Sequence, residues 1–314
     1  MSTKVLTIDT KKKILKCQGP VNEEWVRYEK LIVCTGSKPV RLTCAGSNLK
    51  NIYHVRNEHD TAALVRKLER ETGNRFQDRK LAPLKGKSGV LQSSRKLGAD
   101  EALELSGMFK DDDIDNEAND HAVVLGGGYL GVELATALHG WGFSEVHIAF
   151  KGDMLYQKLP WDPRFRAKVQ AEIEKRAPNL KLHPNTTVEK CSPREETSQA
   201  LGSVTLSDGK MIETHTLIAA IGAVPSGKEL FSKKAVTVVN NNNVAVDENL
   251  RLKSSETKDV FVCGELASPE CGVEAARAMG KYAAVCAFND RMMNPLSPPF
   301  SIQFPFRYSR LFEY

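Results

Sequence analysis

The sequence predicts an α/β protein in which parallel sheets are combined with helices. After a polar stretch, regular structure returns sharply at His121, where a strand, a glycine-rich turn, a helix and a second strand follow one another as far as about residue 150. That succession is a βαβ unit, whose two strands lie parallel. Three more short apolar runs end in glycine, as buried strands of such sheets can do: LIVCTG, LIAAIG and DVFVCG. The length of 314 residues suits about two domains.

Composition and charge exclude several classes of partner. The chain is 41% hydrophobic and 26% charged, which is ordinary for a soluble globular protein. No apolar run approaches the roughly 18 residues of a membrane span, and the amino-terminal MSTKVLTIDTKKK lacks the apolar core of a signal peptide. The net charge is only +5, and the basic run Lys11–Lys13 is interpreted as a hairpin turn because no aromatic residues are interleaved with it. We therefore expect neither a membrane nor a nucleic acid as partner.

The cysteines indicate a reducing compartment. There are seven, an odd number, and none forms a CxxC pair. Reduced thiols in a cytosol-like environment are the natural interpretation, so a cytoplasmic location is expected. Cys34 and Cys263 stand inside apolar strands and are interpreted as core packing. No metal site is assigned.

Hydrophobic periodicity assigns the remaining elements in chain order. The first 20 residues indicate a β-hairpin, and Asp60–Glu71 indicate a helix. Residues from about 72 to 120 are polar with blocks of charge, and are interpreted as a surface insertion or disordered loop, with a regulatory or partner-binding role as the alternative. Beyond the βαβ unit we expect an amphipathic helix, three stretches of strand and a helix rich in small residues: RFRAKVQAEIEKRA, KLHPNTTVEKCS, SVTLSDGK, HTLIAAIG and VEAARAMGKYAAVCAFN.

The glycine-rich turn has the GxGxxG spacing of a dinucleotide site. Gly126, Gly128 and Gly131 follow an apolar strand and open a helix, which is the context that the motif requires. The first glycine permits the tight turn, the second lets backbone amides approach a pyrophosphate, and the third lets the helix pack on the strand. The helix N-terminus then presents unpaired N–H groups to the phosphates.

The residue that would select between NADH and NADPH is left open by the sequence. An acidic residue that binds the ribose 2′-hydroxyl is expected at the end of the second strand, about 20 residues beyond the glycines. The sequence there is Phe150, Lys151, Gly152 and Asp153. Lys151 could attract a 2′-phosphate and Asp153 could reach a ribose, so both nucleotides remain candidates.

Taken together and in this order around GGGYLGVE, the glycine-ending strands resemble the two-dinucleotide flavoprotein fold. That resemblance implies two interleaved Rossmann-like domains of the FAD/NAD(P)-binding type, and it covers nearly the whole chain outside about 72–120. The match looks closest to the monodehydroascorbate reductases. It rests on these strings: VVLGGGYLGVELA, RLT at 41–43, NIYHVRNEHDTAALV, VEAAR and FPFRYSRLF.

The resemblance implies a division of the chain into five parts. These are expected to be part of an FAD-binding domain, the end of a helix with a probable disordered insertion, an NAD(P)-binding domain, a return to the FAD-binding domain and the start of a truncated interface domain, at residues 1–66, 67–120, 121–246, 247–290 and 291–314.

The resemblance also implies a site, residue by residue. Arg56 and Asn57 would lie by FAD, the pair Gly264–Glu265 by its ribityl chain, and Val273 by its isoalloxazine ring. Arg277 would bind an organic radical, and Tyr308 would lie between flavin, nucleotide and substrate. The strand-ending residues Thr35 and Gly36 are further FAD candidates. The pyridine nucleotide would be bound by Gly126, Gly127, Gly128, Tyr129, Leu130, Gly131, Val132 and Gly222, with Glu133 near the nicotinamide.

Some positions depart from the family pattern. Glu265 stands where the family has Asp, Cys271 and Gly272 where it has Glu-His, and Ala275 where it has His. The family also begins with a GxGxxG βαβ unit that holds the ADP half of FAD, and this sequence starts after it. We therefore expect a fold that lacks the first FAD βαβ unit and binds FAD weakly, as in a fragment, a mis-predicted gene product or a degenerate paralogue.

The function implied is that of an enzyme. Hydride would pass from NADH or NADPH to FAD, and electrons would then pass singly to monodehydroascorbate radicals, which regenerates ascorbate. The alternatives are a ferredoxin- or rubredoxin-type reductase whose acceptor is a small protein, and a non-catalytic nucleotide-binding fragment. The sequence does not predict an oligomeric state.

Overall fold

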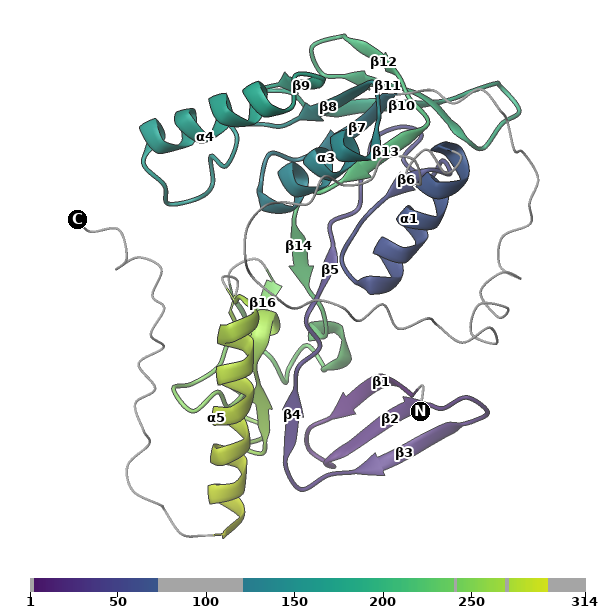
Figure 1. The fold of residues 1–314 in the computed structure, drawn as a ribbon. Helices are drawn as coiled ribbons and strands as arrows, with labels where there is room; N and C mark the ends of the chain where they lie inside the picture. Colours follow the sequence, from purple (N-terminus) through teal and green to yellow (C-terminus); the bar gives the residue numbers. More distant parts are fainter. Residues whose placement is uncertain (1–2, 73–120, 240–241, 269–270, 293–314) are drawn as a thin grey trace.

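The computed structural model describes residues 3–72, 121–239, 242–268 and 271–292 (Figure 1). The expected insertion and Tyr308 lie outside these ranges. In the described part the chain forms two units, one above the other in Figure 1, joined by a narrow ribbon of two strands.

The upper unit is built on a five-stranded parallel sheet. Its order is β6-β13-β7-β8-β9, with the expected βαβ unit at its centre. The helix α3, Tyr129–Trp141, connects β7 to β8 and confirms the prediction for residues 121–150. The strands are Ile52–Tyr53 (β6), Thr216–Ala219 (β13), His121–Leu125 (β7), Glu145–Ala149 (β8) and Leu180–His183 (β9).

This sheet is covered on both faces, which explains why its central strands are largely apolar and buried. On one face the buried side chains of Val124 and Ile148 pack with α3 and with α1, Glu58–Thr72. The helix α4, Pro163–Arg176, adds partly buried side chains to the same cluster. On the other face lies a three-stranded antiparallel sheet, in the order β10-β11-β12. Its strands are Val188–Pro193, Leu201–Leu206 and Met211–Glu213.

The stretch KLHPNTTVEKCS divides into two strands rather than one. β9 ends at His183 and β10 begins at Val188, because the chain turns at Asn185, which has a φ of 54°. Asn tolerates this left-handed conformation better than most residues. The predicted SDGK hairpin turn is confirmed, since Gly209 with φ 85° joins β11 to β12.

β6 and α1 pack with the upper unit, although the sequence places residues 1–66 with the lower one. Ile52 and Tyr53 pair with β13, and Leu64 and Leu68 are buried against the same core as β7 and β8. The domain boundaries stay a proposal, and this packing favours a first boundary before Ile52.

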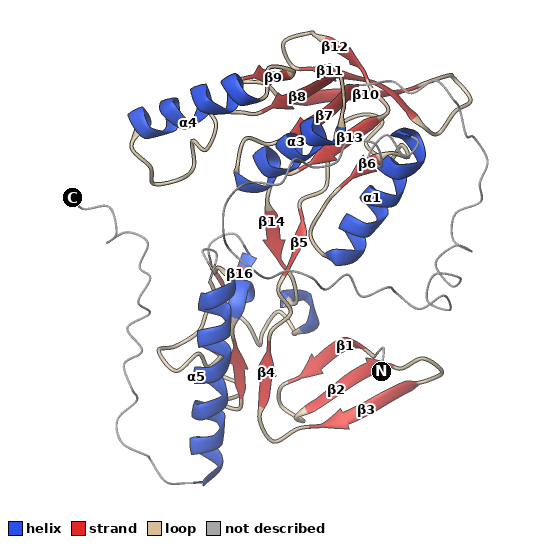
Figure 2. Ribbon diagram, in the orientation of Figure 1, coloured by secondary structure: helices blue, strands red, loops and turns tan. Residues whose placement is uncertain are grey.

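The lower unit contains the predicted hairpin. β1 (Lys4–Asp9) and β2 (Ile14–Gln18) are antiparallel, with Lys11–Lys13 at the turn. A third strand, β3 (Glu23–Arg27), extends them. The sequence did not reveal it, because all five residues are exposed and its charged side chains do not alternate with apolar ones. Figure 2 shows this sheet beside the strand β4.

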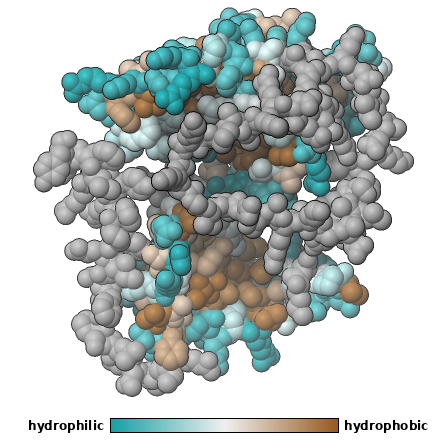
Figure 3. All heavy atoms as spheres, in the orientation of Figure 1, coloured by the Kyte–Doolittle hydropathy of each residue, from teal (hydrophilic) through white to brown (hydrophobic). Residues whose placement is uncertain are grey.

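A second, parallel pair of strands forms the core of the lower unit. β4 (Leu31–Val33) pairs with β17 (Val260–Val262), whose three residues are fully buried. The helix α5, Val273–Met292, covers one side of β17 through Met279 and Ala283. Short elements complete the unit: β15 (Val238–Val239), β16 (Asn243–Val244), and the 3₁₀ turns η1 (Lys228–Leu230) and η3 (Gly264–Leu266). Apolar side chains gather over this unit between α5 and the β1–β3 sheet (Figure 3).

The ribbon between the units consists of β5 (Ser37–Pro39) and β14 (Ala223–Pro225). They are antiparallel, and the chain passes upward through one and downward through the other (Figure 1). This return of the chain is what the interleaved architecture requires, so the predicted fold class is confirmed.

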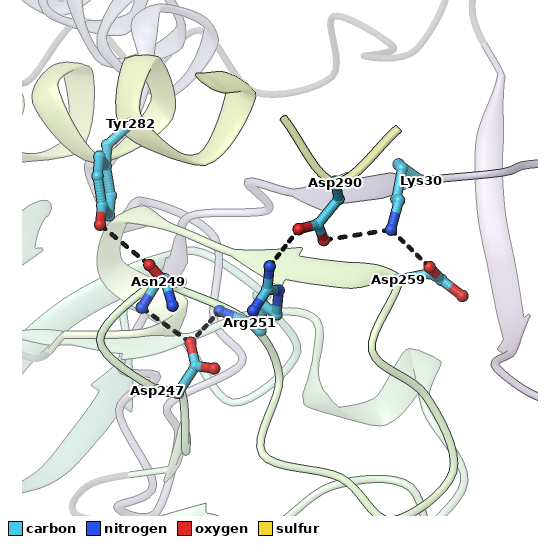
Figure 4. Close-up of polar contacts among 7 residues, drawn as sticks. All are labelled: Lys30, Asp247, Asn249, Arg251, Asp259, Tyr282 and Asp290. Atoms are coloured by element: carbon cyan, nitrogen blue, oxygen red, sulfur yellow. Dashed lines mark hydrogen bonds and ion pairs between the residues drawn. The ribbon is translucent and has the colours of Figure 1, made fainter. Parts of the chain in front are cut away.

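A polar cluster fixes α5 to the strand pair (Figure 4). The ammonium of Lys30 lies 2.7 Å from a carboxylate oxygen of Asp259 and 3.2 Å from one of Asp290 on α5. Arg251 forms a further ion pair with Asp290. Burial alone would lower the pKa of Lys30, but its hydrogen bonds to the two carboxylates outweigh burial and raise that pKa above its usual value. The cluster therefore holds the helix whose first turns carry Val273 and Arg277.

Replacing Asp290 by Asn should loosen α5, because one carboxylate serves both Lys30 and Arg251. We expect Asp290→Asn to lower the free energy of unfolding by about 1–3 kcal/mol, since it removes charge-assisted hydrogen bonds from partly buried partners. Denaturant unfolding measures this loss. Glu213→Gln removes an exposed carboxylate in the upper unit and serves as the matched control. Equal stability of the two variants would contradict the role of Asp290.

Candidate functional site

The glycine turn after β7 is shaped by two close backbone approaches and by one close contact with an aromatic ring. Gly126 has a φ of 124°, and a Cβ on it would lie 2.2 Å from the carbonyl oxygen of Ala220. A Cβ on Gly131 would lie 1.8 Å from the carbonyl oxygen of Gly126 itself. No side chain fits either place. Gly127 is nearly as restricted, because a Cβ there would come within 2.9 Å of the Phe150 ring.

Gly128 differs from its neighbours, since a Cβ built on it meets nothing within 4 Å. It is the N-cap of α3, and no side chain caps the helix there. The N–H groups of the first helical turn have no acceptor within the helix, so they and the positive end of the helix dipole face open space beside Gly128. This arrangement fits a dinucleotide pyrophosphate, as the sequence predicts.

Most of the predicted residues around the turn are exposed. Tyr129, Leu130 and Glu133 are exposed on α3, whereas Val132 is buried. Lys151 is exposed directly after the buried Phe150 at the end of β8, and Asp153 is exposed as well. Because both side chains are exposed, Lys151 and Asp153 are equally accessible to the ribose end of a nucleotide.

Aromatic rings beside the turn were not anticipated. The rings of Tyr129, Tyr156 and Trp161 lie with centroids 5.1–5.6 Å apart, and Phe165 continues the cluster. The backbone N–H of Tyr156 donates to the carbonyl oxygen of Gly127 over 2.7 Å, which holds the loop after β8 against the turn. These contacts join loops separated by more than 20 residues, and no local pattern in the sequence indicates them.

A second set of predicted residues converges in the lower unit, where β4 and β17 end side by side. The backbone turns sharply after both strands, at Gly36 with φ 63° and Gly264 with φ 73°. Between the turns lies the carboxylate of Glu265, which accepts a hydrogen bond from the Ser37 hydroxyl over 3.0 Å and forms an ion pair with Arg56. The structure thus brings Gly36, Arg56, Gly264 and Glu265 together, as the resemblance implies.

Other predicted residues have visible structural roles. The Thr35 hydroxyl donates to the carbonyl oxygen of Ser226, which ties β4 to the chain after the ribbon. Gly222, with φ 106°, accepts the N–H of Val40 at the ribbon's upper end. Asn57 caps α1, because its side-chain oxygen accepts the N–H of Asp60 over 2.9 Å.

Val273 and Arg277 lie on the first turns of α5 and point to solvent. Val273 is 84% exposed, and Arg277 is exposed one turn later. In the part of the chain that the structure describes, the guanidinium of Arg277 has no ion-pair partner, so it is available to an anionic ligand. The start of α5 lies against the turn at Gly264, since a Cβ there would be 3.8 Å from that of Ala276.

Two cysteines form an unexpected pair at the base of this second set. Cys34 and Cys263 follow β4 and β17, and their Sγ atoms lie 2.9 Å apart. Cys263 is buried and Cys34 is exposed. The hydrogen bond from Cys263 lowers the pKa of Cys34 to about 7, against the opposing effect of burial, and the same contact raises the pKa of Cys263. The interpretation of Cys34 as core packing is therefore wrong, because Cys34 is an exposed thiol whose pKa is lowered.

The comparison with known proteins agrees with this geometry. Residues 1–283 match the profile of the family Pyridine nucleotide-disulphide oxidoreductase. The chain belongs to this family. Because the family and its neighbours are FAD- and NAD(P)H-dependent oxidoreductases, the expected cofactor classes are confirmed at the level of the family.

Individual members are only distantly similar. The chain is 26% identical over 267 residues to the rubredoxin-NAD(+) reductase of Pseudomonas putida, covering 85% of this chain and 53% of that protein. It is 24% identical over 297 residues to monodehydroascorbate reductase 5 of Oryza sativa subsp. japonica, covering 92% and 48%. The chain thus spans about half the length of these curated relatives.

The fold is shared with solved structures of other proteins. The water-forming NADH oxidase of Lactobacillus brevis, solved with NADH bound, superposes with a TM-score of 0.66 at 18% identity, over 91% of this chain and 52% of that one. At this identity the likeness concerns the fold. In the described residues, no helix is both long and apolar enough to cross a membrane.

The Cys34 thiol should react as a thiolate near neutral pH. We expect its rate of alkylation by iodoacetamide to reach half its maximum near pH 7. Cys263→Ala removes the hydrogen-bond donor, so this midpoint should rise toward the ordinary value of 9.0. Mass spectrometry of the labelled peptides across a pH series measures both midpoints.

A second thiol pair in the same protein provides the control. Cys44 and Cys191 lie 3.9 Å apart, and burial raises the pKa of Cys191 to about 12. Cys191→Ala should leave the pH profile of Cys34 unchanged. Identical midpoints for Cys34 in the wild type and in Cys263→Ala would show that the pairing does not acidify it.

Proposed function

We propose that this chain acts in an FAD-dependent reductase that takes hydride from NADH or NADPH and delivers electrons singly to a small anionic radical of the monodehydroascorbate class. The observation that carries the proposal is the uncapped N-terminus of α3 beside Gly128, with the exposed Arg277 as the cation for an acceptor. The likeness to monodehydroascorbate reductases supports the acceptor class.

The residues of the chain would divide the work as follows. The backbone amides at the start of α3 would bind the nicotinamide dinucleotide by its pyrophosphate, with Gly222 nearby and Glu133 toward the nicotinamide. Bound flavin would supply the conversion of a two-electron donor into single-electron steps. Arg56 and Glu265 would line the flavin's ribityl side, Val273 its ring, and Arg277 would hold the acceptor carboxylate or enolate by charge-assisted hydrogen bonds. The role expected for Tyr308 stays a proposal as well.

Glu265 can be accommodated in this role. One methylene longer than Asp, its carboxylate is turned toward Arg56 and Ser37, and its backbone oxygen accepts the Asn243 amide over 2.6 Å. The ion pair with Arg56 uses the extra length. A flavin hydroxyl could then be met by the carboxylate oxygen that is left or by Arg56 itself.

The likeness to rubredoxin reductases favours a second candidate, in which the acceptor is a small electron-transfer protein. The two differ in what Arg277 does, because an acceptor protein would contact a broad surface and depend little on one guanidinium. Acceptor assays with a radical and with rubredoxin separate them. The cytoplasmic location stays part of the proposal.

Gly128→Val tests the nucleotide site without damaging the fold. Its side chain would enter open space where the pyrophosphate is expected, so we predict at least a ~10-fold weaker Kd for the preferred nucleotide, equivalent to about 1.4 kcal/mol. Gly140→Val places the same side chain in equally open space near the other end of α3 and should leave affinity unchanged. Titration of NADH and NADPH into all three proteins measures this and decides which nucleotide is preferred. Equal affinity of Gly128→Val and the wild type would refute the site.

Arg277→Ala tests the acceptor site. With the flavin-loaded protein, we expect the KM for monodehydroascorbate to rise about tenfold or more, because a charge-assisted hydrogen bond is lost, while the KM for an uncharged quinone changes little. Lys281→Ala removes an exposed cation one turn further along the same face of α5 and is the control. An equal rise in KM for both acceptors would contradict the assignment and indicate damage to the fold.

A further inference from the structure

A cluster of histidines lies at the end of the parallel sheet opposite the glycine turn. His121 and Glu145 are the first residues of β7 and β8 and stand directly opposite each other in the register. His147 follows two residues after Glu145, so strand alternation places both on one face of the sheet. The ligand atoms of these three side chains all lie within 4.8 Å of one another.

His147 carries the central observation. Its side chain is only 4% exposed, and its Nδ1 lies 3.0 Å from Nε2 of His183 on β9. The contact with His183 uses one ring nitrogen of His147 and leaves the other to face Glu145. Its buried Nε2 has no hydrogen-bond partner and lies 3.3 Å from a carboxylate oxygen of Glu145.

A neutral imidazole carries its one proton on either of its two nitrogens, and the choice decides what lies between His147 and Glu145. With the proton on Nδ1, His147 donates to His183, and the lone pair of Nε2 faces the carboxylate oxygen directly. Two lone pairs at this separation repel each other unless a cation stands between them. In that tautomer a buried nitrogen ligand and a carboxylate converge on one point, with His121 beside them.

We propose that His121, Glu145 and His147 bind a divalent transition-metal ion, best matched by Zn²⁺, with His183 orienting His147 from behind. Two imidazoles and one carboxylate are a recurrent zinc ligand set that leaves the fourth position to water. A metal-bound histidine commonly donates its other N–H to a fixed acceptor, and His183 supplies one here.

The ligands need only small movements to reach a metal. Metal–ligand distances of about 2.0–2.1 Å in a tetrahedron bring the ligand atoms to roughly 3.3 Å from one another. His147 and Glu145 already have this separation. Glu145 is 39% exposed and His121 is partly buried, so both can rotate, and the open fourth position would face solvent.

A nearby cation weakens the site without blocking it. The ammonium of Lys181 lies 4.0 Å from a carboxylate oxygen of Glu145. Lys181 is 45% exposed, so it can swing into water when a metal binds. The ion would link the starts of β7 and β8, far from the pyrophosphate, and we assign it a stabilising role that is independent of the proposed reaction.

Metal binding to the purified chain tests this inference. After treatment with a chelator and its removal, Zn²⁺ should bind at one equivalent in calorimetric titration and raise the Tm. Glu145→Gln and His121→Asn alter partly exposed ligands and should weaken the Kd at least ~10-fold and abolish the rise in Tm; His183→Ala should weaken it ~10- to 100-fold, as loss of a second-sphere partner does. His59→Asn, an exposed histidine on α1, should bind like the wild type.

Cobalt separates this site from the cysteines. Co²⁺ bound by histidine and carboxylate shows visible bands without the intense near-ultraviolet absorption of a thiolate–cobalt bond. Zn²⁺ binding that is absent, that is unaffected by Glu145→Gln and His121→Asn, or that shows thiolate absorption with Co²⁺ would overturn the proposal. Because none of these readouts uses enzyme turnover, failure here would leave the proposed function standing.

Discussion

Around Gly126, three stretches of backbone lie closer to one another than any side chain permits. The turn after β7 lies against the end of β13 at Ala220 and against the first turn of α3 at Gly131. These contacts place the start of α3 beside the open space at Gly128, and the five-stranded parallel sheet fixes the orientation of the helix. The nucleotide site is thus a property of backbone packing rather than of charged side chains, which is why its key positions are glycines.

In the lower unit, ion pairs rather than close backbone contacts hold the predicted site residues in place. Its two turns at Gly36 and Gly264 expose a carboxylate, and Arg56, from the chain between the ribbon and α1, neutralises it. Asp290 is shared between Lys30 and Arg251 in the same way, which fixes α5. The charges of Arg56 and Glu265, and those of Lys30 and Asp290, therefore meet from segments more than 200 residues apart in sequence. The residues expected to contact flavin and acceptor depend on these ion pairs for their positions.

The sequence was sufficient where structure is set locally. The glycine turn, the βαβ unit, the first hairpin and the helix at 58–72 follow from spacing and periodicity within short windows. It was insufficient where residues meet across the chain: the acidic Cys34 needs Cys263, the aromatic cluster needs the loop after β8, and His147 needs β9 beside it. β3 was missed because an exposed strand carries no apolar alternation. The thiol pair and the histidine contact depend on strand register, which no single motif encodes.

The ribbon of β5 and β14 has a mechanical consequence. Its two strands of three residues each are paired with each other along their length, and in the described chain they join the units beside the ion pair of Arg56 and Glu265. Such a ribbon resists stretching and sliding, because both would break its ladder, but it bends readily about an axis lying across the strands. Bending at the ribbon is therefore the relative movement of the units that its ladder opposes least. The uncapped end of α3 lies in the upper unit and the turns beside Glu265 lie in the lower one, so such bending would change the distance between them.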